Sequence, residues 1–226
     1  MLHRHDVLLR ASDNADAAGT TVAPPSNVIL PRLRSDAAAE RDTLQRASSL
    51  LLLDRAKIQA WQRLLFVECG DGWIVEEAWR RVRRGYVCGV DTSAALVDRA
   101  TALRGVPGAL EFKLWDGSRL PCPSGFFQSV LSTVALDRCS DPAEVLGEMH
   151  RVLQAGGDLH LLERDQSPRQ PPNVAPSLVA MLHGAGFQEV IQSAIPVEGG
   201  EDVGAVIMHA RATPLAARRG RPPTDE

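Results

Sequence analysis

Apolar runs and amphipathic helical patterns alternate along the middle of the chain, and this alternation limits the possible folds more than any other feature of the sequence. From Leu64 to Glu163, short apolar segments with the length of buried strands are separated by segments with helical periodicity. Strands that alternate with helices predict a parallel sheet with helices on both faces. We therefore expect an α/β fold built on a doubly wound sheet.

The boundaries of the expected elements follow from the periodicity. Buried strands are predicted at 64–68, 86–91, 109–115, 129–136 and 158–163, and helices at 73–84, 94–105 and 142–154. The last of these helices should stop at Gly156–Gly157, a common C-terminal signal. A further helix is expected at 177–187. The strand candidates 188–195 and 203–210 flank Gly199–Gly200 and are expected to pair antiparallel.

The 226 residues suffice for one sizeable core. Residues 1–34 are predicted to be a flexible arm, and 214–226 a disordered tail. The single domain between them, 35–213, has three parts: N-terminal helices at 35–61, a core at 62–165, and a C-terminal helix with the last two strands at 174–213. Ser35 is a plausible N-cap. The run Leu50–Leu53 belongs either to one long helix or to a break between two shorter ones.

Composition excludes several classes of function. Lysine and arginine number 25 against 28 aspartates and glutamates, a formal charge of −3. Binders of nucleic acid that ignore base sequence normally carry a basic surplus, so we expect no nucleic-acid partner. No apolar segment approaches the roughly 20 residues of a membrane span. The four cysteines form no C-x-x-C pair, which predicts free thiols, no metal site and a reducing, cytoplasmic location.

Candidate binding residues follow three of the predicted strands. Cys69-Gly70-Asp71-Gly72 comes after the first strand, Asp91 after the second and Asp116 after the third. In a doubly wound sheet, ligands bind beyond the carboxyl ends of the strands. Glycines let the backbone approach a ligand closely, and the following helix presents free N–H groups there. An acidic residue about 20 positions further on is well placed to accept hydrogen bonds from ribose hydroxyls.

Each of these residues also has a purely structural interpretation. Asp91, Thr92 or Ser93 is suited to cap the helix that begins at Ala94, and this role is compatible with ribose binding. Asp116 before Gly117 is typical of an ordinary Asp-Gly turn. The case for a ligand site rests on all three signals occurring in order, each at a predicted strand end.

The stretch from Leu64 to Glu163 resembles class I S-adenosylmethionine-dependent methyltransferases, and the type-11 branch in particular. The resemblance is carried by these segments: LLFVECGDGW, VCGVDTSAALVDRA, FKLWDGSRLPCPSGFF, VLGEMHRVLQAGGDLHLLE and AGFQEV. It implies a Rossmann-like sheet of seven strands with the last antiparallel.

The same resemblance implies S-adenosylmethionine as the cofactor. It implies binding by these residues: Glu68, Gly70, Gly72, Asp91, Thr92, Asp116, Gly117 and Ser132. Ser132 and Thr133 would lie near the sulfonium or the substrate. No catalytic side chain is expected, since such enzymes often work by proximity and alignment.

The glycine motif departs from the family pattern. If Gly70 and Gly72 are its second and third glycines, Phe66 replaces the usual acid and Glu68 the first glycine. A shifted alignment makes Glu68 the acid, but Ile74 then replaces the third glycine. We prefer the first alignment because Trp73 then begins the helix at the usual place.

The sequence is compatible with two main hypotheses about function. The leading hypothesis is methyl transfer to a small-molecule acceptor, with an open substrate side that a protein partner could complete. The alternative is a catalytically inactive methyltransferase-like protein that serves as a binding or assembly subunit. Oxidoreduction with a nicotinamide cofactor fits less well, because the Asp116 segment and the antiparallel ending do not suit it.

Overall fold

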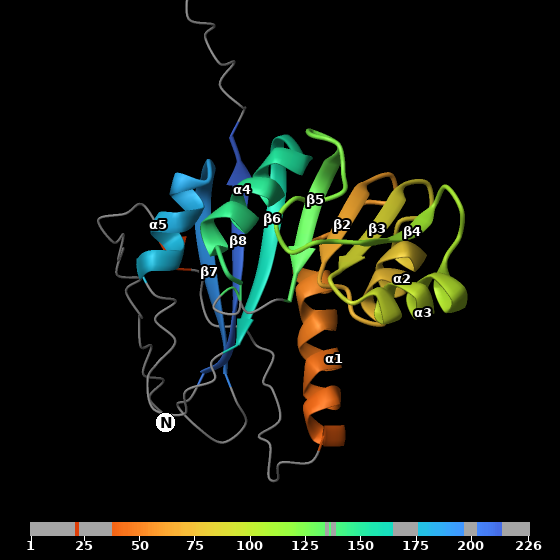
Figure 1. The fold of residues 1–226 in the computed structure, drawn as a ribbon. Helices are drawn as coiled ribbons and strands as arrows, with labels where there is room; N and C mark the ends of the chain where they lie inside the picture. Colours follow the sequence, from red (N-terminus) through yellow and green to blue (C-terminus); the bar gives the residue numbers. More distant parts are fainter. Residues whose placement is uncertain are drawn as a thin grey trace, which may run out of the picture.

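The computed structural model describes residues 21–22, 38–133, 136, 139–164, 176–196 and 203–213. Within this part of the chain, one sheet carries helices on both faces (Figure 1). The elements are, in order, β1 (Thr21–Val22), α1 (Ala38–Arg55), β2 (Arg63–Val67), α2 (Trp73–Arg81), β3 (Tyr86–Asp91), α3 (Ala94–Arg104), β4 (Leu110–Leu114), β5 (Phe127–Ser132), α4 (Pro142–Val152), β6 (Leu153–Arg164), α5 (Pro176–Gly184), β7 (Phe187–Pro196) and β8 (Val203–Ala212). Ser35, the Pro-rich connector as far as residue 175 and the C-terminal tail lie outside the described residues.

The strand order is β1-β7-β8-β6-β5-β2-β3-β4. Strand β2 pairs in parallel with β3 on one side and β5 on the other, so the order reverses beside β2. Strand β8 runs antiparallel to both β6 and β7. The predicted seven-stranded sheet with an antiparallel last strand is confirmed. In addition, Thr21 and Val22, within the segment predicted as an arm, pair with β7 and extend the sheet.

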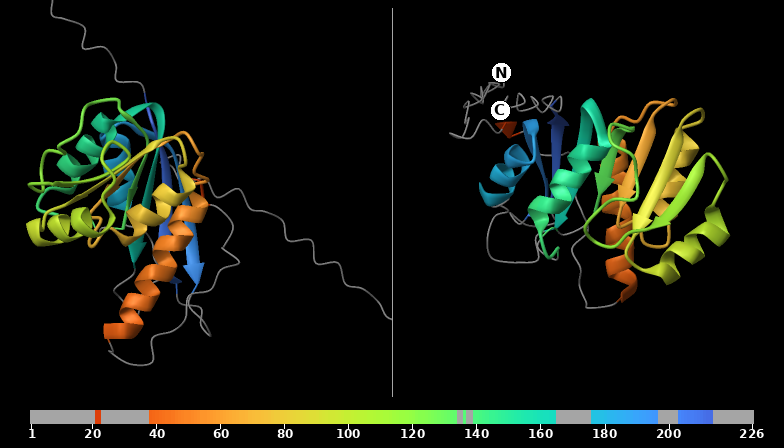
Figure 2. Two further views of the ribbon diagram at one scale, coloured as in Figure 1. Left: turned by 90° about the vertical axis from the view of Figure 1, so that its right-hand side faces the viewer. Right: turned by 45° about the horizontal axis from the view of Figure 1, so that its top comes forward.

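Two hydrophobic clusters lie on opposite faces of the sheet. Alternate residues of β2 divide between them, as the period of a strand requires. Leu65 and Val67 pack in the cluster that includes α4 and α5, whereas Leu64 and Phe66 pack in the cluster that includes α1, α2 and α3. The left view of Figure 2 shows the sheet between α4 and α1. Apolar residues cover both faces, and in a sheet of this kind ligands bind beyond the carboxyl ends of the strands.

The extent of helix α1 decides between two alternatives of the sequence analysis, and the end of helix α4 differs from the expected one. Helix α1 is continuous from Ala38 to Arg55, so the alternative of two shorter helices is wrong. Helix α4 ends at Val152, and the prediction that it ends at Gly156–Gly157 is also wrong. Leu153 already pairs with Phe127 of β5 and starts β6. The two glycines lie instead where the β5–β6 register is interrupted, so strand pairing, and not a glycine cap, ends the helix.

The loop after β4 is tied to helix α4 by a partly buried ion pair. The Glu148 carboxylate accepts from the Leu120 N–H at 2.9 Å, and Arg151 donates to the Leu120 and Cys122 carbonyls at 3.0 Å. Arg151 also donates to Glu148 at 2.6 Å. The Arg151 guanidinium lowers the pKa of Glu148 below its ordinary value. This pair therefore fixes the path of the segment that follows Asp116.

We expect Glu148→Gln to lower the free energy of unfolding by about 1 to 2 kcal/mol at pH 7, because charge-assisted bonds are lost. A carboxyl group with a depressed folded pKa contributes stability above its unfolded pKa, about 4.3, and loses it as pH falls through the folded value. The variant should therefore lose less stability than the wild type in acid. Urea unfolding between pH 7 and pH 3 measures this, with Glu144→Gln, an exposed carboxylate of the same helix, as control. Equal acid sensitivity of wild type and Glu148→Gln would contradict it.

Gly72, directly before α2, packs tightly against Phe112 of β4 and Ala100 of α3. Its φ is 77°, and a Cβ there would lie 2.6 Å from Phe112 Cε1 and 2.9 Å from Ala100 Cβ. We expect Gly72→Ala to destabilise the protein by about 2 to 4 kcal/mol through combined backbone strain and overpacking. Gly108 has a φ of 76°, and a methyl group added there would meet only open space, so Gly108→Ala should cost only the strain. Thermal and urea unfolding compare the two, and equal losses would refute the packing argument.

Candidate functional site

The glycine turn between β2 and α2 has a repeating left-handed backbone. β2 ends at Val67 and α2 begins at Trp73, while Glu68, Gly70 and Gly72 have φ values of 54°, 57° and 77°. A Cβ placed on Gly70 would meet nothing within 4 Å, so this residue faces open space. The positive φ at Glu68 is the conformation that a glycine would supply, which agrees with the first of the two alignments.

Asp91 connects the end of β3 to the glycine turn. Its side chain is buried, with 6% exposed, and its Oδ2 accepts from the Gly70 N–H at 2.8 Å. Its Oδ1 accepts from the Ser93 N–H at 2.9 Å. The cap of α3 is Ser93, whose hydroxyl accepts from Leu96 N–H at 3.4 Å, so neither Asp91 nor Thr92 is the N-cap. A carboxylate has about four acceptor sites, so Asp91 retains capacity for ligand hydroxyls.

Asp116 forms the Asp-Gly turn that its sequence context predicted. Its Oδ1 accepts from the Ser118 N–H at 2.9 Å, the Ser118 hydroxyl at 3.1 Å and the Arg119 N–H at 3.0 Å. These hydrogen bonds lower the pKa of Asp116, and the backbone N–H of Ser118 has the largest effect. The carboxylate is therefore ionised at neutral pH and exposed at the surface.

The three strand ends converge. The Trp115 N–H donates to the Asp91 carbonyl at 2.9 Å, which places the residues after β4 beside the end of β3. A Cβ built on Gly117 would lie 4.0 Å from the methyl carbon of Thr92. Together with the bond from Gly70 to Asp91, these contacts form a continuous edge from the glycine turn to the Asp116 turn.

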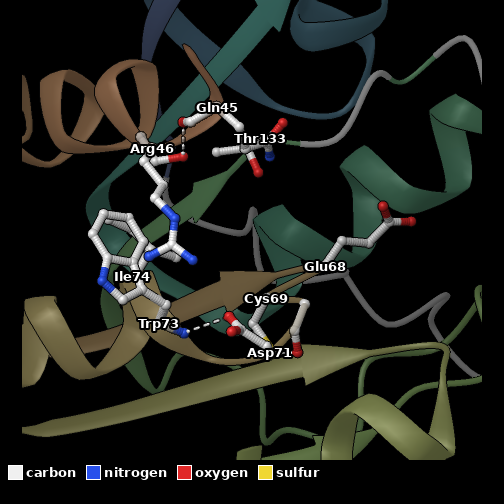
Figure 3. A pocket seen from close by; sticks show the side chains of 10 residues that line it. Gln45, Arg46, Glu68, Cys69, Asp71, Trp73, Ile74 and Thr133 are labelled. Carbon is white, nitrogen blue, oxygen red and sulfur yellow. Dashed lines mark hydrogen bonds between the residues drawn. The ribbon is translucent and has the colours of Figure 1, made fainter. Parts of the chain in front are cut away.

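The remaining predicted residues lie at the margins of this edge. Ser132 is buried, and its hydroxyl donates to the Val67 carbonyl at 3.4 Å, whereas the next residue, Thr133, lines a cavity. Glu68 is exposed at the cavity rim. Figure 3 shows its carboxylate directed away from Arg46 and Asp71.

The cavity lies on the α1 side of the glycine turn and has a volume of about 120 Å³. Its lining comes from the turn, the first residues of α2, Thr133 and the α1 residues Gln45, Arg46 and Ser49. Sites for whole small-molecule ligands usually enclose roughly 300 Å³ or more, so this cavity suits one end of a ligand. The rest of the ligand would lie along the open edge beside Asp91.

Arg46 was not among the residues predicted from the sequence. Its guanidinium carbon lies 4.9 Å from the ring centroid of Trp73, and both side chains border the cavity (Figure 3). Arg46 comes from α1, which no motif connects to the glycine turn. The only signal was the helical pattern of α1, whose packing against the sheet brings the arginine to this place.

Cys69 also lines the cavity, and its thiol has low reactivity. Burial, assisted by the charge of Asp91, raises the pKa of the Cys69 thiol to about 12. The thiolate is the nucleophilic form of cysteine, so this group stays neutral and unreactive near pH 7. A site of this kind tolerates an electrophile without trapping it on the protein.

Comparisons with known proteins show which family the chain is similar to. Residues 65–161 match a family model described as a methyltransferase domain. The chain is 29% identical over 136 residues to a demethylmenaquinone methyltransferase of Deinococcus radiodurans, an alignment that covers 60% of this chain and 52% of that protein. It is 31% identical over 120 residues to a malonyl-[acyl-carrier protein] O-methyltransferase of Erwinia billingiae, with coverages of 51% and 44%. The chain thus spans about half the length of these relatives.

A solved structure shows the same fold. The S-adenosylmethionine-dependent methyltransferase from Aquifex aeolicus aligns with a TM-score of 0.59 at 16% identity, over 79% of this chain and 100% of that one. The family match covers the glycine turn and the ends of β3, β4 and β5, where the site residues converge. Residues 65–161 therefore match the type-11 methyltransferase domain, and the fold is that of class I S-adenosylmethionine-dependent methyltransferases.

Proposed function

We propose that this protein transfers the methyl group of S-adenosylmethionine to a small-molecule acceptor. The observation that carries the proposal is the 2.8 Å bond from the Gly70 N–H to the buried Asp91 carboxylate, because it joins the glycine turn to the acid expected at the ribose. When bound, the cofactor supplies an activated methyl group on a sulfonium. Everything else required of the protein is binding, orientation and exclusion of water.

The open edge fits the adenosine end of the cofactor. Asp91 would accept hydrogen bonds from the ribose hydroxyls with its remaining acceptor sites, and Thr92 would lie beside the sugar. The three hydrogen bonds that form the Asp116 turn go to Oδ1, which leaves Oδ2 to accept from the adenine amino group. Gly117 would let the backbone lie close to the ring.

The cavity fits the amino-acid end of the cofactor. Gly70 would bring the backbone against the ligand, and Gly72 shapes the start of α2, whose N-terminus favours a carboxylate. Arg46 would add a positive charge on the same side. Glu68 would lie at the rim of the ligand site. Ser132 would hold the start of the turn in place through its hydrogen bond to the Val67 carbonyl.

The chemistry would rest on alignment. An acceptor nucleophile that enters beside Thr133 and α1 would meet the methyl group at the end of β5, where the strand order reverses. Holding the two reactants in line supplies much of the rate enhancement in such reactions, so no dedicated base is required. The neutral thiol of Cys69 would not compete for the methyl group.

The direct test has two steps. Calorimetry should show that the full chain binds S-adenosylmethionine and S-adenosylhomocysteine with micromolar affinity. Incubation with methyl-labelled cofactor and small-molecule extracts should then place the label in the small-molecule fraction. Binding without transfer to any fraction would favour the catalytically inactive alternative. A folded protein that binds neither compound would refute the proposal.

Gly70→Ala should weaken S-adenosylmethionine binding at least about tenfold, because the added methyl group would occupy the space that the ligand needs. The matched control is Gly108→Ala, which shares a positive φ and open surroundings but lies outside the site. Both variants should lose similar stability from the left-handed backbone, so unfolding does not distinguish them and calorimetric affinity does. Equal affinities for the two variants would exclude Gly70 from the site.

Asp116→Asn should change which base the site accepts. Because the turn holds Oδ1, the amide nitrogen would replace Oδ2 and face the adenine amino group as a second donor. We expect S-adenosylhomocysteine to bind about tenfold more weakly, and the deaminated S-inosylhomocysteine to gain relative to it. Competition calorimetry gives both constants, with the exposed Asp98→Asn as control. An unchanged ratio of the two affinities would place Asp116 away from the base.

A further inference from the structure

We propose that Arg104 is a positioning residue for the cofactor site. From α3, it binds the glycine turn and fixes its position, so that the turn can hold the amino-acid end of the ligand. This inference rests on the proposed function. Arg104 belongs to the last turn of α3, and no motif in the sequence connects it to the turn. Its side chain is only 19% exposed.

Arg104 binds both the backbone and the side chain of the middle residue of the turn. Its Nε donates to the Asp71 carbonyl at 3.0 Å, and one terminal nitrogen donates to Asp71 Oδ2 at 3.4 Å. The other terminal nitrogen donates to Glu76 Oε2 at 2.8 Å in the first turn of α2. One planar group therefore holds the turn and the helix that follows it. A lysine cannot reproduce this fork with its single nitrogen.

The turn needs an anchor at this residue. Asp71 lies between Gly70 and Gly72, which have no side chains to pack and both have a positive φ. The Asp71 Oδ1 accepts from the Trp73 N–H at 3.1 Å, so the same side chain starts α2. Arg104 therefore binds a residue that also contributes a hydrogen bond to the first turn of α2.

Charge gives Arg104 a second effect on the site. Asp71 and Glu76 place two carboxylates beside the N-terminus of α2, the end of a helix that favours an anion. Asp71 also lines the cavity proposed for the amino-acid end of the cofactor. The guanidinium of Arg104 offsets the charge of Asp71 and shares that of Glu76 with Arg80. Without Arg104, the two carboxylates would repel a ligand carboxylate next to the turn.

The test compares Arg104→Met with Arg80→Met in the full chain. Arg80 is a matched control because it binds the same Glu76 at 2.7 Å and also pairs with Glu77, which lies outside the turn. We expect Arg104→Met to weaken S-adenosylhomocysteine binding about tenfold or more relative to Arg80→Met. The affinity for 5′-methylthioadenosine, which lacks the amino-acid end, should change less than about threefold. A general loss of structure would lower both affinities together.

Two further variants keep the inference testable if Arg104→Met folds poorly. Arg104→Lys should fold and show an intermediate loss of S-adenosylhomocysteine affinity. Asp71→Asn added to Arg104→Met should recover part of the loss, because it removes a carboxylate charge while Oδ1 can still accept from Trp73. Equal affinities of the Arg104 and Arg80 variants, beside a wild type that binds, would overturn the role of Arg104 alone. A wild type that does not bind would overturn the proposed function.

Discussion

The hydrogen bond between the Gly70 N–H and the Asp91 carboxylate is the contact on which the rest of the site depends. A buried carboxylate is costly unless donors surround it, and here two backbone N–H groups, of Gly70 and Ser93, satisfy it. The bond joins residues 21 positions apart, at the ends of two neighbouring parallel strands. Because Trp115 then binds the Asp91 carbonyl, the third strand end is drawn to the same edge.

At position 66, where the resemblance predicts an acid, this chain has Phe66, and a charged side chain near the cavity comes from α1 instead. Phe66 is 2% exposed and packs in the cluster that includes Leu52 and Leu53 of α1. It therefore helps to dock α1 and does not reach toward a ligand. The docked helix in turn brings Arg46 to the cavity. The position where the resemblance predicts an acid therefore packs in the core, and a charged side chain for the same region comes from another helix.

The sequence predicted those parts of the site that depend on local patterns. Strand ends, the turn glycines and the acid about 20 positions later follow from periodicity and spacing, and the structure brings Gly70, Asp91 and Gly117 to one edge. Arg46 and Arg104 escaped prediction because their places are set by how α1 and α3 pack, which is a long-range property. The end of α4 was missed for a similar reason, since pairing with β5 overrides the glycine signal.

Glu68 shows why a degenerate motif need not mean a degenerate site. An ordinary residue in the left-handed region costs about 1 to 2 kcal/mol relative to a right-handed one, a strain that a folded domain can absorb. At φ 54° Glu68 keeps the backbone course of the turn, and its side chain is exposed, so no charge is buried. Figure 3 shows that the carboxylate leaves the space beside Arg46 open. The substitution therefore changes the sequence of the motif, while the left-handed turn, its bond to Asp91 and the adjoining cavity are all present.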